Sequence, residues 1–516
     1  MEIKPVFVTA RSIMFEVIED ANYFTEEYEI LVNDIVVSKS DRVIETIYDL
    51  KPDTTYMVQI RRGMFISNSM QIHTKYEFVT LNVRDFGAKG DGITDDTASI
   101  QATIMCCPKD GRVYINNGIY KFTNLFLKSN LILEIDKDAT LSAFTDKSHI
   151  PILPGRVESY DEEKEYLIGS WEGNPLTSFA SLITGISVEN VVICGRGTID
   201  GCADFQNWWD KEKRKHDPAR PRMVFLNHCR NVTLQGLTIM NSPAWNLHPY
   251  FSENLKFLGL SIFSPSKSHN TDGLDPESCR NVDIIGVHFS VGDDCIAIKS
   301  GKIYMGKTYK TPSSNIMIRQ CFMENGHGAI TVGSEIAAGV KEITATDCLF
   351  INTDRGLRIK TRRGRGKDSV LDEITFKRIK MDQVRTPFVI NSFYYCDPDG
   401  KTDYVATKEA LPIDERTPEI RRIHIQDVLC DHVHVAACYF YGLPEKKIEE
   451  ITMENVRFNY AEDAKPGTAA MMKGCDPTSK MGIFIRNASR VILKNVILNG
   501  NEGKNIDIAG VEDVEY

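Results

Sequence analysis

The stretch Cys229-Arg-Asn-Val-Thr-Leu234 returns in altered form along much of the chain. The recurring asparagines in these copies are Asn190, Asn231, Asn254, Asn281 and Asn315. Their spacings of 41, 23, 27 and 34 residues fit one repeat plus loops of variable length. Because one short strand and turn cannot bury its own apolar side chains, such repeats stack on one another. We therefore predict an all-β chain built mainly as a right-handed parallel β-helix, with the asparagines in an internal hydrogen-bonded ladder at the turns.

A second set of motifs carries ionisable side chains at similar intervals. The chain reads His269-Asn-Thr-Asp-Gly273, then Gly292-Asp-Asp294, Gly326-His-Gly328 and Arg358-Ile-Lys360. The gaps are 21 residues from Asp272 to Asp293, 33 from Asp294 to His327 and 33 from His327 to Lys360. If each gap is one turn of the coil, these groups line one wall about 4.8 Å apart per coil.

The adjacent carboxylates Asp293 and Asp294 suit acid–base chemistry. Cleavage of a glycosidic bond needs a proton donor for the leaving oxygen and a base or nucleophile on the other side of the sugar. In a regular strand the two aspartates would point to opposite faces. Ile296 and Ile298 share the parity of Asp294 and should face the core. Asp294 therefore reaches the wall only if the chain bends, which Gly292 permits.

The cations and the histidine extend this chemistry to an anionic sugar. Arg358 and Lys360 are two residues apart, so they share one face of a strand. An arginine can hold a sugar carboxylate with two hydrogen bonds, and a lysine adds a point charge. His327 lies between two glycines, which let its backbone and ring approach a sugar closely. Closely spaced carboxylates do not all ionise easily, so one of them keeps its proton.

Together the four motifs resemble the polygalacturonase family, glycoside hydrolase family 28, over roughly residues 79–500. The resemblance implies a pectin-lyase-like β-helix that hydrolyses α-1,4-galacturonosidic bonds of pectic chains with inversion, and without a cofactor or metal. It implies that Asp293 is the general acid, that Asp272 and Asp294 activate the water, and that His327 tunes the acid. The substrate-binding residues that it implies are Asn270, Arg358, Lys360 and, one coil further, Tyr394 or Tyr395.

Other functions fit parts of the pattern. Asp272, Asp275 and the pair Asp293 and Asp294 would supply oxygen ligands to calcium, but Gly-His-Gly and Arg-Ile-Lys then have no role. The family's rhamnogalacturonan hydrolases commonly lack the histidine that stands here at His327. A lyase on the same fold would use calcium and an arginine base. A β-helix that only binds polysaccharide is disfavoured by the three intact aspartates.

Residues 1–76 show the period-two alternation of β-strands, at 12–18, 28–32 and 56–61. The stretch Leu50-Lys-Pro-Asp-Thr-Thr-Tyr56 resembles the corner of a fibronectin type III domain, where a tyrosine hydroxyl folds back onto nearby backbone. We expect a small fibronectin type III-like β-sandwich over residues 1–76, acting as a rigid spacer or cleft wall. The β-helix then occupies residues 77–516.

The segment at 81–97 resembles the opening of pectin-degrading β-helices, in which a short helix plugs the first coil. We expect that helix at 96–105, capped by Thr94 or Asp95. The acidic residues of the segment are then structural.

Three insertions interrupt the repeat, at residues 150–178, 202–222 and 396–417. The first two precede the catalytic motifs, so we expect them at the N-terminal end of the groove, with the sandwich supporting them there. A wall at that end leaves a fixed number of sugar subsites, which favours attack from a chain end. Without the wall the groove is open and the enzyme would be endo-acting.

Composition narrows the class of protein. The 516 residues are 42% hydrophobic and 26% charged, which is ordinary for a globular protein, and no apolar run approaches the ~18 residues of a membrane helix. The net charge of −10 argues against nucleic acid as a partner. The start Met1-Glu-Ile-Lys-Pro5 lacks the features of a signal peptide, which predicts the cytoplasm, or secretion if the sequence was trimmed. The 13 cysteines lack zinc spacing and fit buried, reduced thiols, and the sequence leaves the oligomeric state open.

Overall fold

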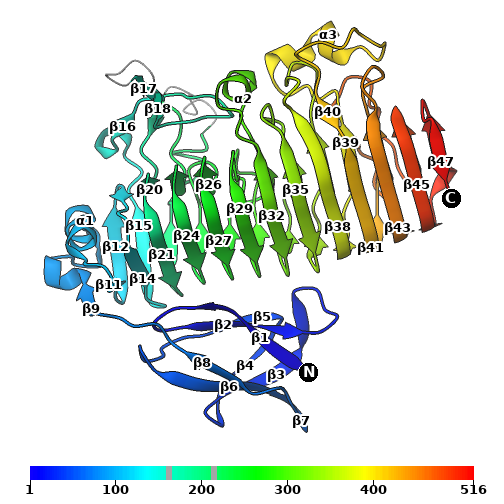
Figure 1. Cartoon of the computed structure of the whole chain (residues 1–516). Coiled ribbons are helices and arrows are strands. Elements are labelled where there is room, and N and C mark those ends of the chain that lie inside the picture. The colour runs from blue at the N-terminus through cyan, green and yellow to red at the C-terminus, as the bar shows by residue number, and fades with distance from the viewer. Residues whose placement is uncertain (159–164, 211–217) are drawn as a thin grey trace.

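The computed structural model describes residues 1–158, 165–210 and 218–516. Figure 1 shows a long stack of coils with a small β-sandwich lying along one side of it. Strands of the stack pair in parallel with the strands one coil earlier. The prediction of an all-β chain with a parallel β-helix is therefore confirmed.

Three ladders of parallel strands form the walls of the stack. The first ladder consists of β9 (Val79–Asn82), β11 (Gly111–Ile115), β14 (Leu131–Ile135), β21 (Glu189–Gly195), β24 (Arg230–Gln235), β27 (Glu253–Leu258), β29 (Arg280–Ile285), β32 (Ser313–Arg319), β35 (Val340–Thr346), β38 (Val370–Asp382), β41 (Arg422–Val433), β43 (Ile448–Tyr460), β45 (Ala488–Asn499) and β47 (Asp513–Glu515), with β40 (Glu419–Ile420) beside β38. The second consists of β10 (Asp91–Asp95), β12 (Gly118–Phe122), β15 (Ala139–Ala143), β22 (Thr198–Asp200), β25 (Thr238–Met240), β28 (Ser261–Phe263), β30 (His288–Ser290), β33 (Phe322–Glu324) and β36 (Leu349–Ile351), and ends on β38.

The third ladder carries the candidate site. It begins with β13 (Leu125–Phe126), β20 (Ile183–Ile186), β23 (Val224–Asn227) and β26 (Leu247–Tyr250). It continues with β31 (Ile296–Ile298), β34 (Ile330–Val332), β37 (Arg355–Lys360), β39 (Thr386–Asn391), β42 (Ala436–Tyr441), β44 (Met481–Arg486) and β46 (Glu502–Ala509). The segment around Leu274 joins the two parts, because Leu274 bridges both Leu247 and Ile296.

Equivalent apolar residues of successive coils stack on one another in the core. In the first ladder the paired residues are all buried; they are Val191, Val232, Leu255, Val282, Ile316, Ile343, Ile374, Ile423, Ile451 and Val491. Each coil thus covers the apolar side chains of its neighbours, which a single coil cannot do for itself.

The recurring asparagines form the predicted ladder at one turn. The Nδ2 atom of Asn231 donates to Oδ1 of Asn190 at 3.1 Å, and Asn315 donates to Asn281 at 2.8 Å. Their backbones are left-handed, with φ of 58° at Asn190 and 53° at Asn315. Asparagine tolerates that conformation better than most residues. The ladder is exposed rather than internal, because the side chains lie outside the turn in solvent.

A short helix covers the open end of the first coil, as expected. Helix α1 (Thr97–Cys106) begins one residue later than predicted and buries Ile100 and Ile104. The N-cap residue is Asp96 and not the predicted Thr94 or Asp95, although the Asp95 carboxylate accepts from the Thr97 amide at 3.0 Å. Its neighbour Asp96 instead holds the preceding loop through the amides of Lys89 and Gly90. The 3-10 helix η1 (Val83–Phe86) packs beside α1.

The N-terminal region is a β-sandwich of two antiparallel sheets. One sheet contains β1 (Glu2–Val8), β2 (Ile13–Ile18) and β5 (Ile44–Ile47); the other contains β3 (Phe24–Val32), β4 (Ile35–Arg42), β6 (Thr55–Arg62), β7 (Phe65–Ile66) and β8 (Met70–His73). The Tyr56 hydroxyl accepts from the Lys51 amide at 2.9 Å, which is the predicted tyrosine corner. We propose that the domain boundary lies between residues 76 and 77, in the segment between the end of β8 and the start of β9 (Val79–Asn82).

The sandwich lies along one side of the coil stack, from the first coils to the middle ones, and does not cover the N-terminal end of the stack (Figure 1). Glu16 pairs with Arg319 at 2.5 Å, and the Asn22 amide donates to the Arg378 carbonyl at 2.7 Å. Both partners are in middle coils. The sandwich occupies the side opposite β16 (Ile152–Leu153), β17 (Arg156–Glu158) and α2 (Ile303–Tyr309). The expectation that it supports the insertions or walls the cleft is therefore wrong.

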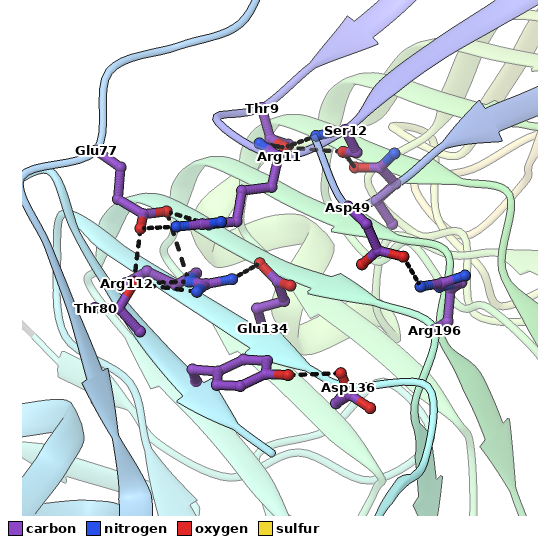
Figure 2. A network of polar contacts seen from close by, with 12 residues as sticks. Thr9, Arg11, Ser12, Asp49, Glu77, Thr80, Arg112, Glu134, Asp136 and Arg196 are labelled. Atoms are coloured by element: carbon purple, nitrogen blue, oxygen red, sulfur yellow. Dashed lines mark hydrogen bonds and ion pairs between the residues drawn. The ribbon is translucent and has the colours of Figure 1, made fainter. Parts of the chain in front are cut away.

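Figure 2 shows the polar network that joins the sandwich to the first coils. Arg11 holds Glu77 with two hydrogen bonds of 3.0 and 2.8 Å. Arg112 stands beside this pair and binds Glu134 of the next coil at 2.9 Å. A separate contact joins Asp49 to Arg196 at 2.6 Å. Bidentate pairing of this kind fixes direction as well as distance, so the network sets the orientation of the sandwich.

The predicted insertions project from the side of the stack that carries the third ladder. Residues 150–178 include β16, β17, β18 (Glu165–Leu167) and β19 (Ser178–Phe179), and 159–164 lie outside the described residues. In 202–222, residues 211–217 likewise lie outside them, and Trp208 and Trp209 are buried in a small apolar cluster. Residues 396–417 contain η3 (Pro398–Lys401) and α3 (Asp403–Ala406). The remaining helix, η2 (Lys147–His149), precedes β16.

Two smaller findings bear on the class of protein. No helix within the described ranges has the length and hydrophobicity to cross a membrane. All thirteen cysteines are free thiols, and most are buried, as expected.

Candidate functional site

The three predicted catalytic aspartates meet on the outer face of the third ladder. Asp293 and Asp294 immediately precede β31, and Asp272 lies on the segment that Leu274 joins to β31. One carboxylate oxygen from each aspartate lies within 4.8 Å of those from the other two. Residues 22 positions apart in sequence are thus brought together by the stacking of two coils.

The bend predicted before β31 is present. Ile296 and Ile298 face the core, whereas the Asp294 side chain lies on the outer face with Arg358. Gly328 of the next coil makes room for it, because a Cβ atom there would lie only 2.7 Å from Asp294 Oδ1. No other residue type would fit at Gly328 without moving the carboxylate.

Asp294 is a fully buried anion held by two cations. Its Oδ1 accepts from Arg358 Nη1 at 2.9 Å, and its Oδ2 accepts from Lys360 Nζ at 2.8 Å. Burial alone would raise the pKa of this carboxyl, but Lys360 and Arg358 outweigh burial and hold the pKa well below its ordinary value. The structure thus places the two predicted sugar-binding cations on one of the predicted catalytic carboxylates.

Asp272 has the opposite environment. It is 4% exposed, and burial, followed by the negative charges of Asp275 and Asp293, raises its pKa well above the ordinary value. Asp293 is the one aspartate of the three that is partly exposed. The cluster therefore combines Asp294, whose surroundings favour the ionised form, Asp272, whose surroundings favour the protonated form, and the partly exposed Asp293.

Lys299 is a charged group of the site that the sequence analysis missed. It is buried directly after the end of β31, with its Nζ 3.3 Å from Glu335 Oε2 and 4.8 Å from the centre of the Trp245 ring. Although burial opposes it, the carboxylates of Glu335 and Asp275 raise the pKa of this lysine. The signal in the sequence was its position directly after Ile298. Because side chains alternate along a strand and Ile298 faces the core, Lys299 should face outward.

His327 lies beside the aspartates. Its backbone amide donates to the Asp293 carbonyl at 3.0 Å, and its ring Nδ1 lies 2.9 Å from Asp354 Oδ2. The bond to Asp354 raises the pKa of the imidazole against the effect of burial, with further help from Asp293 and Asp294. Asp354 was not predicted, because it stands in an ordinary turn before β37.

The remaining predicted residues divide into two groups. Tyr394 is buried, and Lys360 Nζ lies 5.4 Å from its ring centre, so it belongs to the site. Tyr395 instead packs against the apolar cluster around Phe393. Asn270 accepts from Arg220 Nη2 at 2.6 Å, a contact that holds the turn leading to Asp272.

The three carboxylates are close enough together to hold a metal ion. Both oxygens of Asp294, however, are already bonded to Arg358 and Lys360. A divalent cation would have to displace one of these cations or bind beside them at a Coulombic cost. The donor set therefore fits a proton-transfer site better than a calcium site.

A sequence profile of the glycosyl hydrolases family 28 matches residues 163–475, which is more than half of the chain. The chain belongs to this family. A probable polygalacturonase of Vitis vinifera is 31% identical over 400 residues, covering 76% of this chain and 77% of that protein. A second profile, described as rhamnogalacturonase A/epimerase, pectate lyase-like, matches residues 80–133, where the coils begin.

Solved structures agree with this family 28 fold. An exopolygalacturonase of Thermotoga maritima has a TM-score of 0.66 at 25% identity, over 83% of this chain and 94% of that one. A family 28 exopolygalacturonase of Yersinia enterocolitica has a TM-score of 0.74 at 20% identity, over 99% and 98% of the two chains. The second likeness shows that the fold extends over almost the whole chain.

On the N-terminal side of the aspartates lies a buried cluster of Trp171, Trp245 and Arg222, which we call the Trp171 wall. The Trp171 ring stacks on Trp245 at 6.0 Å, and the Arg222 guanidinium lies 4.8 Å from the Trp171 ring centre. Gly173 accepts from the Lys302 amide at 2.9 Å, and a Cβ there would lie 2.7 Å from that nitrogen. The described part of the 150–178 insertion thus packs directly against the site.

On the C-terminal side, a segment between β43 and β44 folds back over the sheet. We call residues 466–472 the return segment. Arg355 donates to its Thr468 carbonyl at 2.8 Å, and Asn391 donates to its Met471 carbonyl at 3.1 Å. Met471 Sδ lies 3.1 Å from Arg358 Nη2. The sequence analysis missed this segment, because it carries no motif and interrupts the repeat late in the chain.

Proposed function

We propose that this family 28 hydrolase is a polygalacturonase, which hydrolyses α-1,4 bonds between galacturonate units of pectic chains. One observation carries the proposal, namely the cluster of Asp272, Asp293 and Asp294 joined to Arg358 and Lys360. The cluster supplies a proton donor and a base, and the cations supply attraction for a uronate carboxylate. The names of the Vitis and Thermotoga relatives support the same substrate class.

Asp293 donates the proton to the leaving oxygen in this proposal. A general acid must come within hydrogen-bond distance of the substrate, and Asp293 is the partly exposed member of the cluster. Asp272 and Asp294 hold the attacking water between them. Asp272 favours its protonated form at rest, so it first passes that proton to Asp293; the freed Asp272 carboxylate then accepts a proton from the attacking water while Asp293 protonates the leaving oxygen.

We propose inversion at the anomeric carbon. The aspartate oxygens lie within 4.8 Å of one another, which is shorter than the ~6.5–9.5 Å usual between carboxyl groups of inverting enzymes. Retention, however, needs a carboxylate free to attack the sugar. Both oxygens of Asp294 are bound by cations, and Asp272 is buried, so neither carboxylate is suited to attack the sugar directly. A water molecule is then the attacking group.

We further propose that the enzyme acts from a chain end. The Trp171 wall and the return segment stand on opposite sides of the aspartates along the stack. A substrate chain lying along the coils would meet both. A site bounded in this way admits a terminal unit and excludes the middle of a long chain. The sequence argument relied on the N-terminal wall alone.

Arg358, Lys360 and Tyr394 form the surface that recognises the uronate. The contacts of Arg358 and Lys360 with Asp294 do not exhaust the donors of Arg358: among the described residues its Nη2 contacts the Met471 thioether, a weak acceptor. A substrate carboxylate would be a far better acceptor for that nitrogen. No cofactor or metal takes part in the proposed reaction.

The test is hydrolysis of polygalacturonate with and without exhaustive chelation. We expect new reducing ends, no absorbance from a 4,5-double bond, no effect of chelator, and the β-anomer as the first product seen by proton NMR. A double bond, or activity lost on chelation and restored by calcium, would identify a lyase instead. The α-anomer first would contradict inversion while leaving the hydrolase assignment intact.

A further inference from the structure

Within the described part of the chain, the carboxylate that pairs with the His327 ring is Asp354, which belongs to the next coil. Ring Nδ1 lies 2.9 Å from Asp354 Oδ2. The His327 side chain remains 52% exposed, so the ring edge that carries Nε2 stays open toward solvent. The backbone amide of the same residue is fixed on the Asp293 carbonyl. The ring is therefore held at one edge by Asp354 and offered at the other beside the proposed acid.

Asp354 is itself held in place. Arg355 Nη1 lies 3.6 Å from Asp354 Oδ2, and the same arginine reaches the return segment at the Thr468 carbonyl. Asn352, two residues earlier, donates to Asn325 of the preceding coil at 2.7 Å. This rung of an asparagine ladder fixes the two turns relative to each other. The carboxylate thus has a defined height opposite the imidazole.

We propose that Asp354 is a positioning residue that orients His327 and keeps its ring protonated, so that Nε2–H donates to a substrate oxygen beside Asp293. The proposal rests on the polygalacturonase function proposed above. It adds a residue that touches neither the substrate nor the aspartate cluster.

The chemistry of imidazole explains why a carboxylate is needed there. A neutral ring has one donor and one acceptor nitrogen, and either nitrogen can carry the proton. A carboxylate at Nδ1 keeps a proton on that nitrogen and favours the second proton on Nε2. An uncharged partner would fix the Nδ1 proton but leave Nε2 as an acceptor at neutral pH.

The charges around the ring act in the same direction. Asp354 faces it from the turn before β37, and Asp293 and Asp294 face it from the turn before β31. All three raise the pKa of His327, so the imidazolium persists to higher pH than in a free histidine. Burial would raise the pKa of Asp354, but the hydrogen bond from His327 and the charges of Arg355 and Arg385 hold it below its ordinary value.

A purely structural role for Asp354 makes a different prediction. If it only anchored Arg355 and the return segment, its loss would lower activity equally at every pH. If it sets the protonation of His327, its loss must move the basic limb of the pH profile to lower pH. The shape of the profile therefore separates the two roles.

The test compares Asp354→Asn with a matched control, Asp382→Asn. Asp382 Oδ1 lies 2.6 Å from Nδ1 of His432, so it forms the same kind of pair further along the stack, outside the aspartate cluster. In Asp354→Asn we expect kcat to fall by roughly 10- to 100-fold, below the effect of losing a general acid. KM should change little, and the basic limb of kcat should shift to lower pH. Asp382→Asn should match wild type.

An NMR titration of the His327 ring provides a readout that does not need activity. The His327 resonance should titrate at lower pH in Asp354→Asn and unchanged in Asp382→Asn. An unchanged His327 titration, or a uniform loss of activity with an unmoved profile, would overturn the proposal. If the wild-type protein does not cleave galacturonan, the proposed function fails, and the titration alone still decides what Asp354 does to His327.

Discussion

At the scale of single residues, exposure and pKa point to different aspartates as the proton donor. Asp293 is partly exposed, so it can reach the leaving oxygen of a bound substrate. The raised pKa of Asp272, in contrast, favours the proton on Asp272 before substrate binds. A shared proton reconciles the two, because closely spaced carboxyls titrate as a group and not one by one. Asp293 therefore remains the proposed donor, since a carboxyl that cannot reach the substrate cannot protonate it.

Asparagine variants of the two aspartates test this assignment. Asp293→Asn should lower kcat on galacturonate oligomers by about 10²–10⁴-fold, with a much smaller change in KM. An aryl galacturonide needs little protonation on leaving, so this variant should recover most of its activity on that substrate. Asp272→Asn should remain impaired on both substrates. The reverse pattern in steady-state assays would make Asp272 the acid.

The sequence predicted the site residues better than their partners. Asp272, Asp293, Asp294, His327 and Lys360 come together because motif spacing and coil spacing agree. The partner that each polar side chain binds depends on how far side chains extend from one coil to the next, and no sequence pattern gives that information. For that reason the contact of Lys360 with Asp294, the Arg220 contact of Asn270, and the role of Asp354 appeared only in the structure.

At the scale of elements, the return segment covers part of the third ladder on the C-terminal side of the aspartates. Ala469, Ala470 and Met472 are buried against Val389 on the outer face of the sheet. Carbonyl groups of the segment are bound by arginine and asparagine side chains of β37 and β39. It is therefore a packed part of the wall, and removing it uncovers the coils beyond Arg358.

Replacing residues 468–472 with two glycines should open the groove on that side. We expect internal cleavage of polygalacturonate to rise, seen as a faster fall of viscosity for each reducing end formed. Thermal unfolding and hydrolysis of digalacturonate serve as controls for folding and for the intact aspartate cluster. An unchanged ratio in a folded, active variant would show that the segment does not limit access.

Elements that follow a period were predictable, and elements that break it were not. The repeated strand sequences, the helix at the first coil and the tyrosine corner are each encoded by residues close together in the sequence. The structure contains all three. The return segment and the position of the sandwich depend on contacts between residues far apart in sequence. Glu16 and Arg319, for example, are joined across about 300 residues of chain.

At the scale of the whole molecule, the two faces of the coil stack have separate tasks. The sandwich packs Met14 and Ile44 against Leu258 and Ile285 on one side. The 150–178 insertion packs on β23 and β26, and the return segment is bound by side chains of β37 and β39, so both lie on the side of the third ladder. The sandwich thus stabilises several coils from behind, while access to the aspartates is decided on the other side.

The size of the first products from polygalacturonate tests the central claim most directly. A groove closed on both sides of the aspartates should release mono- or digalacturonate from the first time point, while the remaining polymer stays long. Chromatography of early samples, with viscosity followed in parallel, makes the measurement. A ladder of intermediate oligomers with a rapid loss of viscosity would contradict attack from the chain end and would show an open groove.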